Sequence, residues 1–128
     1  MSHEGIELLT QQITTPLQSI VRLAMNLRWV WNHATDQVWE ALAPDVWHQT
    51  HNPVLVIQNT PRSRLEELGR NLEFVEKVQR LDHSLSDYLA RPSWFQQTQS
   101  LERPLRIAYF SMEYGITEAR PLYSGGLG

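Results

Sequence analysis

Apolar residues recur every three or four positions over much of this chain, which is the pattern of helices that bury one face. The first such stripe follows Thr14-Thr15-Pro16, and a hydroxyl residue followed by proline is typical of a helix start. The spacing predicts one amphipathic helix over residues 16–34. Its buried stripe would consist of Leu17, Ile20, Val21, Ala24, Leu27, Trp31 and Ala34.

A shorter helix is expected next, because Thr35-Asp36 provides a second start signal and Pro44 ends the segment. Asp45 to Thr50 is predicted to add one short helical turn. The buried stripe of the shorter helix would consist of Val38, Trp39 and Leu42.

The segment after Asn52-Pro53 allows two interpretations. The β-branched content of Val54-Leu55-Val56-Ile57 suits a strand, whereas the preceding cap-then-proline signal suits a helix. We favour a short helix.

The longest stripe begins after Thr60-Pro61 and stays in phase as far as Arg91-Pro92. Gly69 is a position where this stripe can divide into two helices. Ser93 is then expected to cap a short segment over residues 94–97. The apolar members of the stripe are Leu65, Leu68, Leu72, Val75, Val78, Leu81, Leu85 and Leu89.

The periodicity changes after Pro104. Residues 105–110 form a compact β-prone run, of the type expected for a strand buried on both faces, and a glycine-punctuated tail over 123–128 ends the chain. We therefore expect a helical domain over residues 1–104 and the start of an α/β domain over 105–128. Because a lone strand leaves its backbone groups unpaired, the chain is expected to stop within that second domain.

Composition narrows the possible chemistry. The 128 residues carry 11 Lys and Arg against 14 Asp and Glu, a net charge of −3, so nucleic acid is not expected as a principal partner. The absence of cysteine excludes disulfides, thiolate catalysis and zinc sites built with cysteine. No segment resembles a signal peptide or a membrane span, so a cytoplasmic protein is expected.

Lys77 is the only lysine, and it lies beside Glu73 and Glu76. A Schiff-base lysine needs a pKa lowered by burial or by nearby cations, whereas neighbouring carboxylates favour the charged form. We expect Lys77 to be a solvated surface residue.

Two motifs near the end of the chain, Phe-Ser-Met-Glu-Tyr-Gly over 110–115 and Pro-Leu-Tyr-Ser-Gly-Gly-Leu-Gly over 121–128, resemble the opening of the catalytic core of α-glucan (glycogen and maltodextrin) phosphorylases. The segments over 26–32, 42–47 and 51–54 resemble the helical N-terminal extension of shorter members of that family. The resemblance implies a helical domain followed by a two-Rossmann-domain glycosyltransferase. It also implies that the complete enzyme releases glucose 1-phosphate from α-1,4-glucan with inorganic phosphate.

The same resemblance implies pyridoxal 5′-phosphate in the complete enzyme, bound to a lysine further along the family's sequence and absent from this chain. The fragment alone is therefore expected to be inactive, with no catalytic residue and no metal site of its own. A Gly-Gly-x-Gly loop lets backbone amides approach an anion closely. By resemblance, the amide of Gly126 lies near substrate phosphate and Leu127 near the sugar, Gly125 and Gly128 permit the loop, and Glu113 supports the site wall.

Two alternatives stay open at this point. A nucleotide-sugar glucan synthase shares the glycine loop but typically carries a lysine two positions before its first glycine, where this chain has Tyr123. The other alternative is a stand-alone helical module that binds a partner or a glucan, and the unpaired strand argues against it.

Other candidates are better explained by structure than by chemistry. Indole rings can stack on sugars, but Trp31 and Trp39 fit buried stripes and are expected in the core. His48 and His51 have a helical spacing, yet only Asp45 joins them, so we do not expect a metal site. The arginines Arg62, Arg64 and Arg70 are expected to form a solvated face.

Overall fold

The structure is a computed structural model that describes residue 13, residues 15–98 and residues 108, 110 and 117. Within these residues the chain forms helices and contains no strand. Their bounds are η1 Thr15–Leu17, α2 Ser19–Met25, η2 Leu27–Val30, η3 His33–Thr35, α3 Asp36–Leu42, α4 Pro44–Thr50, α5 Pro53–Asn59, α6 Arg62–Arg70, α7 Leu72–Ala90 and α8 Trp94–Thr98, where η denotes a 3₁₀ helix.

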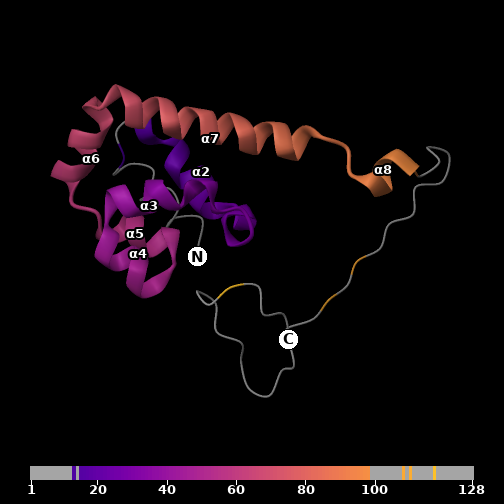
Figure 1. The fold of residues 1–128 in the computed structure, drawn as a ribbon, viewed down its shortest axis with the longest axis horizontal. Coiled ribbons are helices and arrows are strands. Elements are labelled where there is room, and N and C mark those ends of the chain that lie inside the picture. The colour runs from indigo at the N-terminus through magenta and orange to yellow at the C-terminus, as the bar shows by residue number, and fades with distance from the viewer. Residues whose placement is uncertain (1–12, 14, 99–107, 109, 111–116, 118–128) are drawn as a thin grey trace, which may run out of the picture.

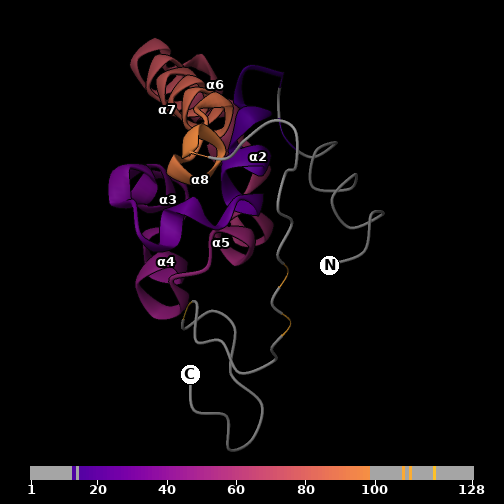
Figure 2. The ribbon, with the colours of Figure 1, turned by 90° about the vertical axis from the view of Figure 1, so that its right-hand side faces the viewer.

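Helix α2 lies at the centre of the arrangement. It packs against α7 on one side and α5 on the other, and α3, α4 and α5 pack on one another beyond it (Figures 1 and 2). Helix α6 leads into α7 and contacts it. The core between these helices includes the fully buried side chains of Leu17, Ile20, Val38, Trp39, Val56 and Val78.

Asparagine side chains start two of these helices. Asn52 Oδ1 accepts hydrogen bonds from the backbone amides of Val54 (3.0 Å) and Leu55 (3.4 Å), so the ambiguous segment is helical, as we favoured. Asn71 Oδ1 accepts from the amide of Phe74 at 3.1 Å and starts α7. The long stripe therefore divides at Asn71, two residues after Gly69.

The prediction of a single helix over 16–34 is wrong beyond Met25. Asn26 is extended (φ −97°, ψ 118°), and its Oδ1 accepts from the amide of Arg28 at 2.9 Å. Asn32 repeats this arrangement with the amide of Ala34 at 3.1 Å. A side chain that takes up backbone donors in this way competes with a continuous α-helix, and two short 3₁₀ helices result.

This break moves two predicted core residues, Trp31 and Ala34, to the surface. Trp31 follows the first 3₁₀ helix and is 60% exposed, so its assignment to the core is wrong. Trp39 is fully buried, as predicted, and its indole nitrogen donates to Thr35 Oγ1 at 3.1 Å.

The remaining helices follow the predictions closely. Helix α3 ends before Pro44, and Pro44 is itself the first residue of α4. Helix α7 ends at Ala90, and α8 begins after Ser93, whose Oγ accepts from the amide of Gln96 at 3.2 Å. Within the described part of the chain, no helix is long and apolar enough to cross a membrane.

The predicted strand over 105–110 lies largely outside the described residues. The two described residues in it, Ala108 and Phe110, are exposed and belong to neither a helix nor a strand. The start of the α/β domain therefore remains a prediction.

Candidate functional site

The predicted substrate-binding residues Glu113, Gly125, Gly126 and Leu127 all lie outside the described residues. The geometry of the glycine loop is accordingly not described. What the structure does describe is the surface of the helical part, whose hollows include three of different chemistry.

The first hollow is a groove of about 540 Å³, which we call the histidine groove. It lies where the two 3₁₀ helices η2 and η3 meet α3 and α4. The described residues that line it include no lysine or arginine. They are Trp29, Val30, His33, Asp36, Glu40, Trp47, His48, His51 and Thr117.

The histidine groove contains an imidazole–carboxylate contact and an imidazole–indole contact. His33 Nδ1 lies 3.2 Å from Asp36 Oδ2, while Asp36 Oδ1 is buried and has no hydrogen-bond partner among the described residues. His51 has a left-handed backbone (φ 43°, ψ 34°) at the end of α4, a position that glycine usually occupies. Its ring meets the Trp47 ring edge-on, with centroids 5.4 Å apart. The groove thus presents imidazole, carboxylate and indole groups.

The described residues do not place the groove's histidines in a metal-binding cluster. Among the described residues, no group of three or more His, Asp or Glu side chains is placed to hold a metal ion. His48 and His51 both line the groove, whereas Asp45, the carboxylate that the sequence pairs with them, does not.

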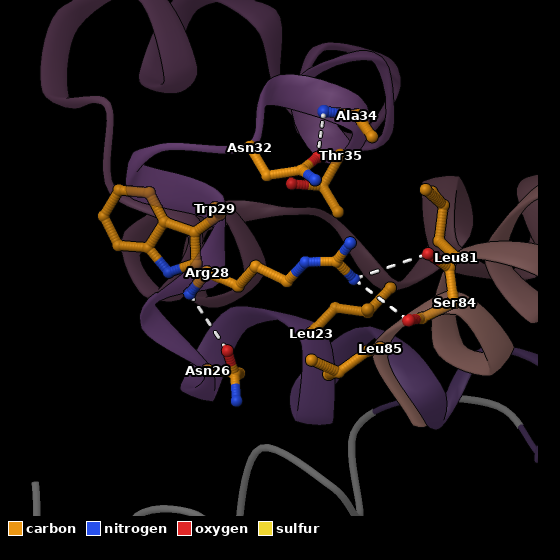
Figure 3. Close-up of a pocket in the computed structure, with 10 residues that line it drawn as sticks. All are labelled: Leu23, Asn26, Arg28, Trp29, Asn32, Ala34, Thr35, Leu81, Ser84 and Leu85. Carbon is orange, nitrogen blue, oxygen red and sulfur yellow. Dashed lines mark hydrogen bonds between the residues drawn. The ribbon is translucent and has the colours of Figure 1, made fainter. Parts of the chain in front are cut away.

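The second hollow is a gap of about 30 Å³ beneath Arg28 (Figure 3). Its volume suits about one water molecule, so it is too small for a sugar. Arg28 Nη1 donates across it to the backbone oxygen of Ser84 at 3.1 Å, which ties η2 to α7. The role of Arg28 here is to hold the helices together.

The third hollow, of about 200 Å³, lies along the last turns of α7, and we call it the basic hollow. The Arg28 guanidinium lies over the Tyr88 ring there, 4.5 Å from its centroid. Arginine outnumbers carboxylate in its lining, which consists of Arg28, Arg80, His83, Ser84, Asp87, Tyr88 and Arg91.

Two expectations about charged side chains need correction. Lys77 is half-buried, and its Nζ donates to Gln37 Oε1 at 2.9 Å, so it holds α7 to α3 as well as meeting solvent. Arg64 is only partly on the solvated face, because its Nε and Nη2 both donate to the Ala41 backbone oxygen, at 3.1 and 2.9 Å. It thereby satisfies a carbonyl in the last turn of α3.

The sequence analysis missed both the histidine groove and the basic hollow. The basic hollow joins η2 to the distant helix α7, whereas the histidine groove draws mainly on the consecutive elements η2, η3, α3 and α4. No motif spans either of them. The one available signal was the pair Asn26 and Asn32, because the helix breaks they cause bring Trp29 and His33 to the groove.

Comparison with known proteins identifies relatives over nearly the whole chain. Residues 13–119 match the family described as "Protein of unknown function (DUF3417)". The chain is 40% identical over 118 residues to "Glycogen phosphorylase" of Mycobacterium tuberculosis, and the matched segment covers 88% of this chain and 14% of that protein. It is 35% identical over 114 residues to "Maltodextrin phosphorylase" of Thermococcus litoralis, again 88% of this chain and 14% of that protein. A "Glycogen phosphorylase" of Aquifex aeolicus is 28% identical over 112 residues.

The chain thus spans about one seventh of the length of these relatives, at their N-terminal end. No solved structure gives a significant match.

Proposed function

The chain belongs to the DUF3417 family, and from this premise we propose that it is the N-terminal region of an α-1,4-glucan phosphorylase. The complete enzyme would transfer a glucosyl unit from the non-reducing end of a glucan to inorganic phosphate and release glucose 1-phosphate. The observation that carries the proposal is the 40% identity to a glycogen phosphorylase over 88% of the chain. The relatives reported above are phosphorylases, which favours this assignment over a glucan synthase.

Within that enzyme, the two parts of the chain have different roles. The helical part over 1–104 supports the catalytic part, and residues 105–128 begin the first Rossmann-type domain. Gly125, Gly126 and Leu127 bind substrate, with the Gly126 amide toward phosphate, and Glu113 supports the site wall. The cofactor is pyridoxal 5′-phosphate, the enzyme is cytoplasmic, and the lysine that binds the cofactor lies outside this chain.

The contact that Lys77 makes supports a structural role for its side chain. Its Nζ is engaged with Gln37 Oε1 at 2.9 Å, and Lys77 lines neither the histidine groove nor the basic hollow. The chain alone should therefore form no borohydride-trappable adduct at Lys77 and release no glucose 1-phosphate from maltodextrin.

The test uses a complete enzyme. This chain replaces the segment that it matches in the M. tuberculosis glycogen phosphorylase, and we call the product the grafted enzyme. It should bind pyridoxal phosphate and release glucose 1-phosphate from maltodextrin. A grafted enzyme that folds and binds the cofactor but phosphorolyses no glucan would contradict the proposal.

The site assignment is tested by Gly126→Val in the grafted enzyme. A branched side chain holds the loop amide away from phosphate and disfavours positive φ. Turnover should fall by roughly 30- to 1000-fold, corresponding to about 2–4 kcal/mol of transition-state stabilisation, with cofactor content unchanged. Trp31→Phe, at an exposed position, is the control and should alter neither turnover nor stability. Normal kinetics of Gly126→Val for both phosphate and glucose 1-phosphate would show that the loop does not touch the reacting groups.

A further inference from the structure

The apolar stripe of α7 continues beyond the helices that cover it. Val78 and Leu85 are buried, and positions 88 and 89 follow Leu85 at the spacing of one helical turn. Tyr88 is nevertheless exposed, and Leu89 is 57% exposed. Figure 1 shows the end of α7 projecting past α2 toward α8. The stripe is therefore longer than the surface that it meets within the described residues.

Helix α8, which follows α7, also exposes apolar side chains. Trp94 is 76% exposed, Phe95 is also exposed, and no residue of α8 is buried. Yet the helix has a capping box, in which the Ser93 amide donates to Gln96 Oε1 at 2.7 Å and the Gln96 amide donates to Ser93 Oγ at 3.2 Å. A five-residue helix is marginal in water without packing, so a start signal combined with an unburied aromatic pair indicates a partner.

We propose that the aromatic end, defined as Tyr88, Leu89, Trp94 and Phe95, is the surface on which the catalytic part of the same polypeptide docks against the helical part. This rests on the proposed function, because the catalytic part is the portion of a phosphorylase that follows the helical region. The matching surface of the catalytic part has an apolar centre and carries carboxylates opposite the basic hollow.

The charge of the partner follows from the side chains next to the aromatic end. Tyr88 belongs both to the aromatic end and to the basic hollow, where Arg28, Arg80 and Arg91 face one carboxylate, Asp87. Arg28 is held by Ser84 and by the Tyr88 ring, and Arg80 lies 3.6 Å from Glu76. A carboxylate on the partner would pair with the arginine cluster, and Arg91 is the arginine adjacent to α8.

Chain length and charge indicate that the catalytic part, rather than a second copy of the chain, covers the aromatic end. The phosphorylase relatives are about seven times as long as the segment matched here, and the aromatic end is the last described part of the helical region before residue 99. A domain tethered directly to this surface encounters it at high effective concentration. A second copy fits less well, because a symmetric contact through the aromatic ends would bring two basic hollows together.

Cysteine labelling tests the proposal cleanly, because the chain has no cysteine. Leu89→Cys reports on the aromatic end, and Leu72→Cys is the matched control: Leu72 is also an exposed leucine of α7 (78%), at its opposite end. Each variant is made in the chain alone and in the grafted enzyme, and maleimide labelling rates are read by peptide mass spectrometry. In the chain alone both positions should label at similar rates. In the grafted enzyme labelling should slow at least tenfold at position 89 and stay fast at position 72.

A charge reversal then tests the electrostatic part. Arg91→Glu in the grafted enzyme should raise the labelling rate at position 89 at least fivefold, and Arg62→Glu, at the exposed first residue of α6, should not. Fast labelling at position 89 in a grafted enzyme that still phosphorolyses maltodextrin would overturn the docking surface and leave the proposed function intact. Protection at position 89 in the chain alone, with dimers in size-exclusion chromatography, would assign the surface to a second copy and overturn the proposal.

Discussion

The middle and the C-terminal end of helix α7 carry the same sequence pattern and meet different surroundings. Along its middle, Val78 and Leu85 are buried against α2 and its neighbours, and Leu85 is 2% exposed. One turn further on, Leu89 continues the stripe at 57% exposure. Helix formation extends smoothly across both regions, to Ala90. The comparison teaches that periodicity specifies the helix, while the length of the neighbouring helices determines which part of its stripe becomes core.

The polar contacts of α7 show a second division, around the helix rather than along it. On the covered side Arg22 of α2 reaches across to Asp82 at 2.6 Å and to Ser86 Oγ at 2.9 Å. On the side that faces solvent, Arg80 Nη1 lies 3.6 Å from Glu76 Oε2 of the same helix. The contacts of Arg22 with α7 fix the register of α7 on α2. The Arg80–Glu76 contact joins neighbouring turns of one helix and does not position α7 against another helix.

The largest effect is expected from Leu85→Ala, which tests the covered half directly. Removing a buried leucine side chain loses its transfer free energy and leaves a cavity, so the free energy of unfolding should fall by about 2–5 kcal/mol. Urea denaturation of the chain, followed by circular dichroism at 222 nm, measures it. A loss below 1 kcal/mol would mean that the covered half of the stripe is as loosely packed as the open half.

A smaller effect is expected from Arg22→Ala. The variant loses contacts to Asp82 and Ser86, but the Arg22 side chain is 45% exposed, so the loss of stability should be only about 1 kcal/mol. Arg80→Ala is the control on the same helix and should cost less than about 0.5 kcal/mol, because both members of its ion pair are exposed. Equal losses for the two variants would remove the distinction between the sides of α7.

Most of the helices could be predicted from the sequence, because their signals are local. Asn52-Pro53 and Ser93 predict helix starts, because each cap side chain accepts a hydrogen bond from a backbone amide two or three residues further on. The structure contains both helix starts. The failure at Asn26 has a physical cause: an asparagine inside an apolar stripe either continues the helix or captures a backbone amide, and the pattern does not distinguish these outcomes.

The candidate functional residues fall into two groups, those identified by resemblance and those brought together by folding. The motif residues Glu113 and Gly126 were identified through resemblance, which needs no tertiary contacts, and their placement stays a prediction. The histidine groove and the basic hollow depend on how separate helices meet. No local pattern reports such a meeting, because residues such as His33 and His51 are brought together only when the chain folds.

The smallest effect on the chain itself is expected from Leu89→Ser, which tests the open half. In the chain alone the side chain is largely in water, so its loss should change the free energy of unfolding by less than about 0.5 kcal/mol. In the grafted enzyme the same change should destabilise the helical part, since the leucine is then buried at the docking surface. Thermal unfolding of both proteins, with Leu72→Ser as the control, measures the difference. If Leu89→Ser costs as much in the chain alone as in the grafted enzyme, the end of α7 is already packed there, and the contrast between its two halves would not hold.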